Sequence, residues 1–154
     1  YRRMMDFEQV VGIKWSVAAS EGEYEDIFEL ADHFSIIDNS LQPVRSHRLG
    51  GRGYINMTSE IHPPHDLKIW DLLESRQYDE AQRLFDSVNG PLRAFYDKVS
   101  VRSGGQGRVK KGLMVVVGRP VGASRPPSKP LNDEELEELR HLVVGFGWPV
   151  PSRP

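Results

Sequence analysis

Cysteine is absent from this sequence of 154 residues, which excludes disulfide bonds, thiolate nucleophiles and cysteine-based zinc sites. No apolar run approaches the roughly 20 residues that cross a membrane, and no apolar core of a signal peptide follows Arg2 and Arg3. Neither sign of charge predominates, since the formal net charge is -2 and like charges do not form long runs. We therefore expect a cytoplasmic protein without nucleic-acid or membrane partners.

The sequence does contain the composition of an ordinary globular domain, with 38% hydrophobic and 27% charged residues. Short apolar segments at 9–14, 34–37 and 54–57 are typical of buried strands. Apolar residues recur at helical spacing over 23–33, and a shorter helix is expected over 42–49. Strands that alternate with helices over short connections indicate parallel strands, and thus an α/β fold.

The rest of the chain is predicted to be helical. One helix begins after Pro64, and an apolar stripe runs over 81–99, with a kink or break expected at Pro91 because proline lacks the amide hydrogen. A last helix starts at Asn132, where Glu135 three positions on predicts a capping box. Three apolar parallel strands need pairing on both edges, so further strands must complete the sheet.

Lys14 is the residue that points most directly to chemistry, because it ends a strand that is otherwise uncharged. Side chains alternate along a strand, so Lys14 shares a face with Gly12, while Val11 and Ile13 share the other. If a helix covers that other face, Lys14 points inward at the carboxyl end of the sheet, where parallel α/β folds build their sites. A neutral lysine there can attack a carbonyl to form a Schiff base. The strand alone leaves open a lysine that merely extends into water.

Five short motifs follow one another at characteristic gaps. They are Gly12-Ile13-Lys14, Leu49-Gly50-Gly51-Arg52-Gly53-Tyr54-Ile55-Asn56, Gln77-Tyr78-Asp79-Glu80-Ala81 with Pro91-Leu92, Val109-Lys110 with Gly118, and Arg125-Pro126-Pro127. In this order they resemble motifs of the dihydrodipicolinate synthase and N-acetylneuraminate lyase family of class I pyruvate aldolases. The resemblance implies the C-terminal portion of a (β/α)8 TIM barrel, strands six to eight, followed by a C-terminal helical extension.

The resemblance also implies a division of the chain. Residues 1–62 correspond to the last three βα units, and residues 63–154 to the final barrel helix and a C-terminal helical region. The N-terminal half of the barrel, with the family's catalytic tyrosine on strand five and its carboxylate-binding turn, has no counterpart in these residues. We therefore expect a truncated chain.

By the same resemblance, Lys14 is the lysine that forms the Schiff base with pyruvate or a related 2-oxo acid. Ile55 stands where the family lines its pyruvate pocket, and Asp38, Asn39 and Asn56 are expected to shape the site from strand ends. The sequence departs from the family after strand seven, where Asp38 and Asn39 replace the usual Gly-Asp. No cofactor and no metal is implied. The implied partners are the 2-oxo acid, an aldehyde, and further copies of the chain in a homo-oligomer such as a tetramer.

Several alternatives stay open at this stage. The first is a lyase or aldolase that cleaves or forms a carbon–carbon bond. The second is a dehydratase or hydratase-aldolase of the same family, and the third is a catalytically silent relative or fragment.

Trp15 follows the lysine and is expected near the mouth of the site, where an indole favours apolar or aromatic aldehydes. His62 and His65 lack a carboxylate to complete a metal site, and the glycine-rich segment 103–108 lacks the ending of a phosphate-binding loop.

Overall fold

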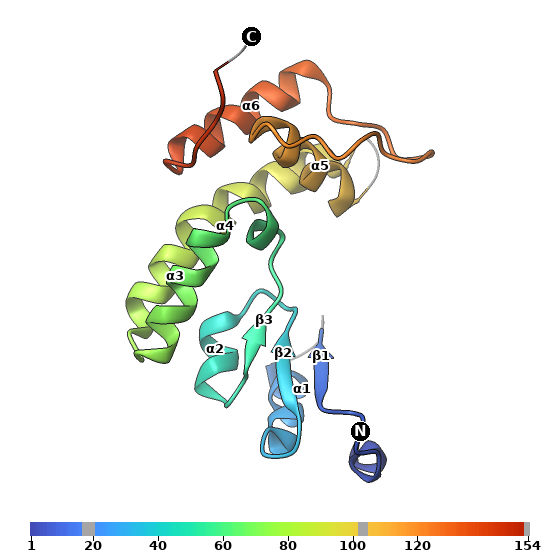
Figure 1. Ribbon diagram of the computed structural model, residues 1–154, viewed down its shortest axis with the longest axis vertical. Coiled ribbons are helices and arrows are strands. Elements are labelled where there is room, and N and C mark those ends of the chain that lie inside the picture. Colours follow the sequence, from blue (N-terminus) through green and yellow to red (C-terminus); the bar gives the residue numbers. More distant parts are fainter. Residues whose placement is uncertain (17–20, 102–104, 153–154) are drawn as a thin grey trace.

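A computed structural model describes residues 1–16, 21–101 and 105–152. A small parallel sheet lies at one end, a pair of helices crosses the middle, and a helical unit forms the other end (Figure 1). The α/β fold class predicted from the sequence is confirmed for the three strands and their crossover helices. No helix in the described part of the chain is both long and apolar enough to cross a membrane.

The elements follow the predicted order closely. With η for a 3-10 helix, they are η1 Arg2–Asp6, β1 Gly12–Trp15, α1 Glu21–Asp26, η2 Ile27–Leu30, β2 Ser35–Asp38, α2 Pro43–Arg48, β3 Gly53–Tyr54, η3 Met57–Glu60, α3 Pro63–Glu74, α4 Tyr78–Ser100, α5 Gln106–Val116 and α6 Asp133–Gly145. The third strand is shorter than predicted, because the chain turns into η3 from Met57 onward.

The three strands pair in parallel in the order β1-β2-β3, and one face of the sheet carries the first core. Ile13 and Ile36 point to this face and pack with Ile27 and Phe34 beneath α1 and η2. Ile36 is completely buried, whereas Lys14, on the opposite face, is exposed. Strand alternation therefore separates a helix-covered face from a face that carries the lysine.

Helix α4 runs without interruption through Pro91, so the break expected there is wrong. The same buried stripe continues on both sides of the proline, through Val88, Leu92 and Phe95. Full burial of each such side chain is worth about 1.5–3 kcal/mol, whereas an interior proline costs about 3 kcal/mol. Packing against the neighbouring helices therefore outweighs the lost hydrogen bond.

Helices α5 and α6 pack on the end of α4 and form the third part of the fold (Figure 1). The Asn132 side chain accepts a hydrogen bond from the Glu135 amide, and the Glu135 carboxylate accepts one from the Asn132 amide, each at 2.8 Å. The predicted capping box is thus confirmed. The core beneath α5 and α6 consists of apolar side chains from both helices, chiefly Val109, Leu113, Val116, Leu139 and Val143.

Arg108 is buried in the same helical unit, with only 2% of the residue exposed. Its guanidinium donates to the carbonyl oxygens of Val99 at 2.6 Å, Lys129 at 3.0 Å and Pro130 at 3.1 Å, and to the Glu135 carboxylate at 2.9 Å. These acceptors come from the end of α4, the proline-rich 119–130 segment and the first turn of α6. One buried cation therefore joins three separate pieces of chain.

His62 and His65 hold the C-terminal segment in place. The ring of His62 stacks on Trp148 at a centroid distance of 4.9 Å, and the buried ring of His65 lies 5.5 Å from the same indole. Within the described residues, Nε2 of His65 has no hydrogen-bond partner, and no three His, Cys, Asp or Glu side chains group as metal ligands. Burial lowers the pKa of His65, although the neighbouring Asp66 carboxylate opposes that shift.

We expect the protein to lose stability as the pH falls from 7.5 to 5.5, in part through His65. The pKa of His65 is lower in the folded protein, so the unfolded chain binds the proton at a higher pH. The contribution of neutral His65 to stability is therefore complete above the ordinary histidine pKa of about 6.5 and is lost as the pH falls below it. Thermal midpoints at both pH values test this, with His65→Leu reducing the pH dependence. The matched control is His141→Leu, whose side chain is 75% exposed on α6. A pH dependence equal in both variants would contradict the assignment to His65.

Candidate functional site

The five residues predicted for the site come from the ends of three neighbouring strands, and strand alternation divides them into two sets. Lys14 is in register with Ile37, which is in register with Gly53. Asn39 and Ile55 lie two positions further along β2 and β3, so they share the face of Lys14. Backbone hydrogen bonds from their amides to the preceding strands extend the sheet to these positions. The structure thus brings Lys14, Asn39 and Ile55 to one face.

This face is the one away from α1 and η2, at the carboxyl end of the strands. Lys14 is exposed, Ile55 is 44% exposed, and Asn39 is half-buried. The Asn39 amide donates to the Ser16 hydroxyl at 3.2 Å. In the described part of the chain, neither a hydrogen bond nor an ion pair engages the Lys14 amine. A primary amine, an amide and two isoleucines therefore share one face, where they offer an attacking nitrogen, a hydrogen-bond donor and apolar surface.

Asp38 lies on the opposite, helix-covered face and is completely buried. Its carboxylate accepts hydrogen bonds from the Tyr24 hydroxyl at 3.0 Å and from the amides of Ser40 and Gln42, both at 2.9 Å. Burial, and next the Asp38 charge, raise the pKa of Tyr24, which keeps its hydroxyl protonated as a donor. The observed contacts of Asp38 therefore hold α1 and the turn after β2 together.

Asn56 is also buried on the covered side, within a network that centres on Asp66. One Asp66 oxygen accepts from the Tyr54 hydroxyl at 2.8 Å and from the Asn56 amide at 3.2 Å, while the other accepts from the Thr58 hydroxyl at 2.7 Å. Burial, and next the Asp66 carboxylate, raise the pKa of Tyr54. Sequence reasoning did not identify Asp66. The sequence feature that could have identified Asp66 is an acidic residue in the first turn of a helix that follows a polar strand end.

Trp15 does not lie near the mouth of the site, and that prediction is wrong. It is in register with Asp38, and its indole nitrogen donates to the carbonyl oxygen of Tyr24 at 3.1 Å. Because Trp15 is one residue beyond Lys14 in the same strand, its side chain points to the other face. The indole therefore packs under the covering helix, and an apolar second substrate loses its structural support.

Residues 103 and 104 of the glycine-rich segment 103–108 lie outside the described residues. Where it is described, it begins α5, and its cations are already engaged. Arg108 is buried on protein acceptors, Lys110 pairs with Glu60 at 2.6 Å, and Lys111 donates to two backbone carbonyls. These contacts explain Arg108 and Lys110 through packing of the helical unit.

Comparison with known proteins places this fold. No protein-family model matches the chain, and no curated protein matches it in sequence. Solved structures do match. Dihydrodipicolinate synthase from Bacteroides thetaiotaomicron superposes with a TM-score of 0.79 at 17% identity, over 94% of this chain and 49% of the other. N-acetylneuraminate lyase from Fusobacterium nucleatum gives 0.75 at 18%, over 94% and 48%. A variant of the Sulfolobus solfataricus 2-keto-3-deoxygluconate aldolase gives 0.71 at 23%, over 89% and 45%.

These matches cover nearly all of this chain but less than half of each solved structure. At such low identity they establish the fold, and the site residues rest on the geometry described above. The family resemblance predicted from the motifs is confirmed at the level of the fold. The chain therefore has the fold of about half of a barrel of the dihydrodipicolinate synthase and N-acetylneuraminate lyase family.

Proposed function

We propose that this chain supplies the Schiff-base lysine, Lys14, and strands six to eight of a class I lyase or aldolase that acts on pyruvate or a related 2-oxo acid. The observation that carries the proposal is the position of Lys14, at the carboxyl end of a parallel sheet and on the face away from its helices. In this assignment residues 1–62 are the last three βα units, and residues 63–154 are the final barrel helix and the C-terminal extension.

The chemistry follows from the amine. The amine of Lys14 attacks the keto carbon of the 2-oxo acid to give a carbinolamine. Uptake of one proton and loss of water then leave a protonated, cationic imine on the nitrogen. The imine accepts the electron pair released when a proton leaves the adjacent carbon, and an enamine results. The enamine carbon then attacks an aldehyde carbon to form a carbon–carbon bond, and water releases the product and restores the amine. The reverse sequence cleaves that bond.

The other residues of the same face bind and orient in this proposal. Ile37 and Ile55 offer an apolar wall for the carbon next to the keto group, and the Asn39 amide offers a hydrogen bond to a substrate oxygen. Asp38 and Asn56 hold the strand ends from behind, through their buried contacts with Tyr24 and Asp66. They therefore act as positioning residues.

A group that moves the protons is also needed. The family resemblance assigns that role to a tyrosine on strand five. Tyr24, which is buried, and Tyr54, which is half-buried, donate to Asp38 and Asp66 on the covered side of the sheet. We therefore assign the proton shuttle to the half of the barrel that completes the sheet. Substitution of that tyrosine would also separate an active lyase from a catalytically silent relative.

The first experiment is reductive trapping. We expect the complete natural protein to gain one covalent pyruvate adduct, on Lys14, when pyruvate and borohydride are added together. Lys14→Arg abolishes the adduct because a guanidinium does not form the imine. Lys68→Arg, at an exposed lysine of α3, retains it. Mass spectrometry of the digested protein locates the adduct, and an adduct on another lysine would refute the assignment.

Separate effects are expected from the two faces of the sheet. Asp38→Ala removes the acceptor of three buried or partly buried donors and costs roughly 2–4 kcal/mol of stability. Ile55→Ala lowers kcat/KM for the 2-oxo acid by about tenfold, with a smaller loss of stability. Denaturant unfolding and steady-state kinetics on both variants test this. The proposal fails if Ile55→Ala leaves kcat/KM unchanged.

The 154-residue chain alone should associate and lack lyase activity, because both edges of its sheet are unpaired within the described residues. Sedimentation velocity and a pyruvate-release assay measure both properties. Val11→Lys, which adds a charge beside the edge strand β1, should reduce association, whereas Val101→Lys, at the exposed C-cap of α4, should not. A monomer with turnover would show that the sheet needs no further strands.

A further inference from the structure

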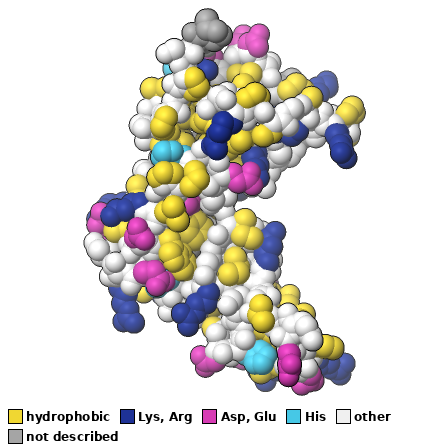
Figure 2. Space-filling model, viewed as in Figure 1, with side chains coloured by type: hydrophobic (Ala, Val, Ile, Leu, Met, Phe, Trp, Pro, Cys, Tyr) yellow, Lys and Arg dark blue, Asp and Glu magenta, His cyan; other side chains and the backbone are white. Residues whose placement is uncertain are grey.

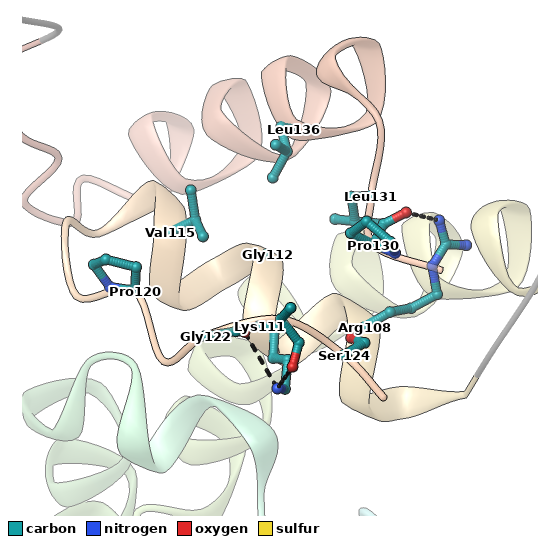
Figure 3. Close-up of a pocket in the computed structure, with 11 residues that line it drawn as sticks. Arg108, Lys111, Gly112, Val115, Pro120, Gly122, Ser124, Pro130, Leu131 and Leu136 are labelled. Atoms are coloured by element: carbon teal, nitrogen blue, oxygen red, sulfur yellow. Dashed lines mark hydrogen bonds between the residues drawn. The ribbon is translucent and has the colours of Figure 1, made fainter. Parts of the chain in front are cut away.

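A cavity of about 250 Å3 lies between α5, α6 and the 119–130 segment, and the proposed function makes no use of it (Figure 3). The side chains around it are mostly apolar, chiefly Val115, Pro120, Pro130, Leu131 and Leu136. An apolar cavity of about 150 Å3 already accommodates benzene. This cavity is therefore large enough for one substituted aromatic ring.

Lys111 gives the cavity a charge. Its ammonium donates to the carbonyl oxygens of Ala123 at 2.6 Å and Gly122 at 3.2 Å, and Figure 3 shows the side chain reaching the 119–130 segment along the wall of the cavity. An ammonium has three donors, so one remains beyond these two. Both acceptors are neutral, and in the described part of the chain no carboxylate pairs with Lys111.

The other two cations of α5 are paired with carboxylates, which distinguishes Lys111 from them. Arg108 pairs with Glu135 at 2.9 Å, and Lys110 pairs with Glu60 at 2.6 Å. None of the residues that line the cavity is an Asp or a Glu. A positive charge with a free donor thus stands at the edge of an apolar space, and a ligand that fits both features is an anion with an apolar body.

We propose that this cavity binds a small aromatic carboxylate, whose ring lies among Val115, Leu131 and Leu136 and whose carboxylate pairs with Lys111. The volume is below the usual 300–1,000 Å3 of pockets for larger organic ligands. It is also bounded on separate sides by two helices and the 119–130 segment, which favours a small molecule over a helix of another protein. The site stands apart from Lys14 and does not depend on the proposed function.

The test uses the complete natural protein and the probe 3-phenylpropanoate, with the uncharged 3-phenylpropan-1-ol as its matched analogue. Calorimetry measures affinity, and methyl NMR spectra report which side chains are perturbed. We expect Lys111→Met to weaken the carboxylate by about fivefold and to leave the alcohol unchanged. Lys110→Met makes the same change of net charge one residue away and should leave both affinities unchanged. Val115→Trp fills the cavity and should abolish both.

Several results would overturn the proposal. Equal affinity for carboxylate and alcohol would remove the role of Lys111, as would equal weakening by Lys110→Met. Binding that survives Val115→Trp, or that leaves the methyl groups of Val115, Leu131 and Leu136 unperturbed in the unsubstituted protein, would place the ligand elsewhere. Absence of binding at a millimolar concentration of the probe would refute it as well. Occupation of the cavity by a neighbouring subunit would have the same consequence. Because no turnover is measured, these outcomes are independent of lyase activity.

Discussion

The arrangement of the two halves of this chain depends on the hydrogen bonds that the Asp66 carboxylate accepts. This carboxylate receives hydrogen bonds from Tyr54, Asn56 and Thr58, so the end of β3 and the turn after it are tied to the first turn of α3. A buried carboxylate is costly unless its oxygens are satisfied, and here three donors from the strand end satisfy them. The helical part of the chain is thereby oriented relative to the sheet, with α3 and α4 lying across its end (Figure 1).

The surface also shows the division of the chain into a sheet end and a helical end. Figure 2 shows apolar side chains gathered in the middle of the molecule, between the sheet end and the helical end. Near there, Tyr54, Leu67 and Trp70 line a groove of about 270 Å3 beside the short strand β3, and Leu67 is 63% exposed. Within the described residues this strand edge is unpaired, and the exposed apolar surface beside it agrees with the proposal that further strands and helices complete the sheet.

The buried cation Arg108 and its half-buried partner Glu135 organise the part of the chain that has no sheet to pack on. Arg108 gathers the end of α4, the 119–130 segment and α6, and its partner Glu135 also closes the cap of α6. A proline-rich segment is thus ordered through its carbonyl groups, which accept from Arg108 and Lys111.

Local sequence determined the order and type of the elements, because each depends on residues that are close together in the chain. Such local features are the strand and helix periods, the Asn132 cap and the position of Lys14 at a strand end. Burial over long distances decided the rest. Pro91 stays helical because packing outweighs its cost. Strand alternation turns Trp15 away from Lys14, but only the tertiary structure shows that the face of Trp15 is the one covered by α1. The predicted site residues divide between two faces for the same reason, since only the pairing of strands shows which face the helices cover.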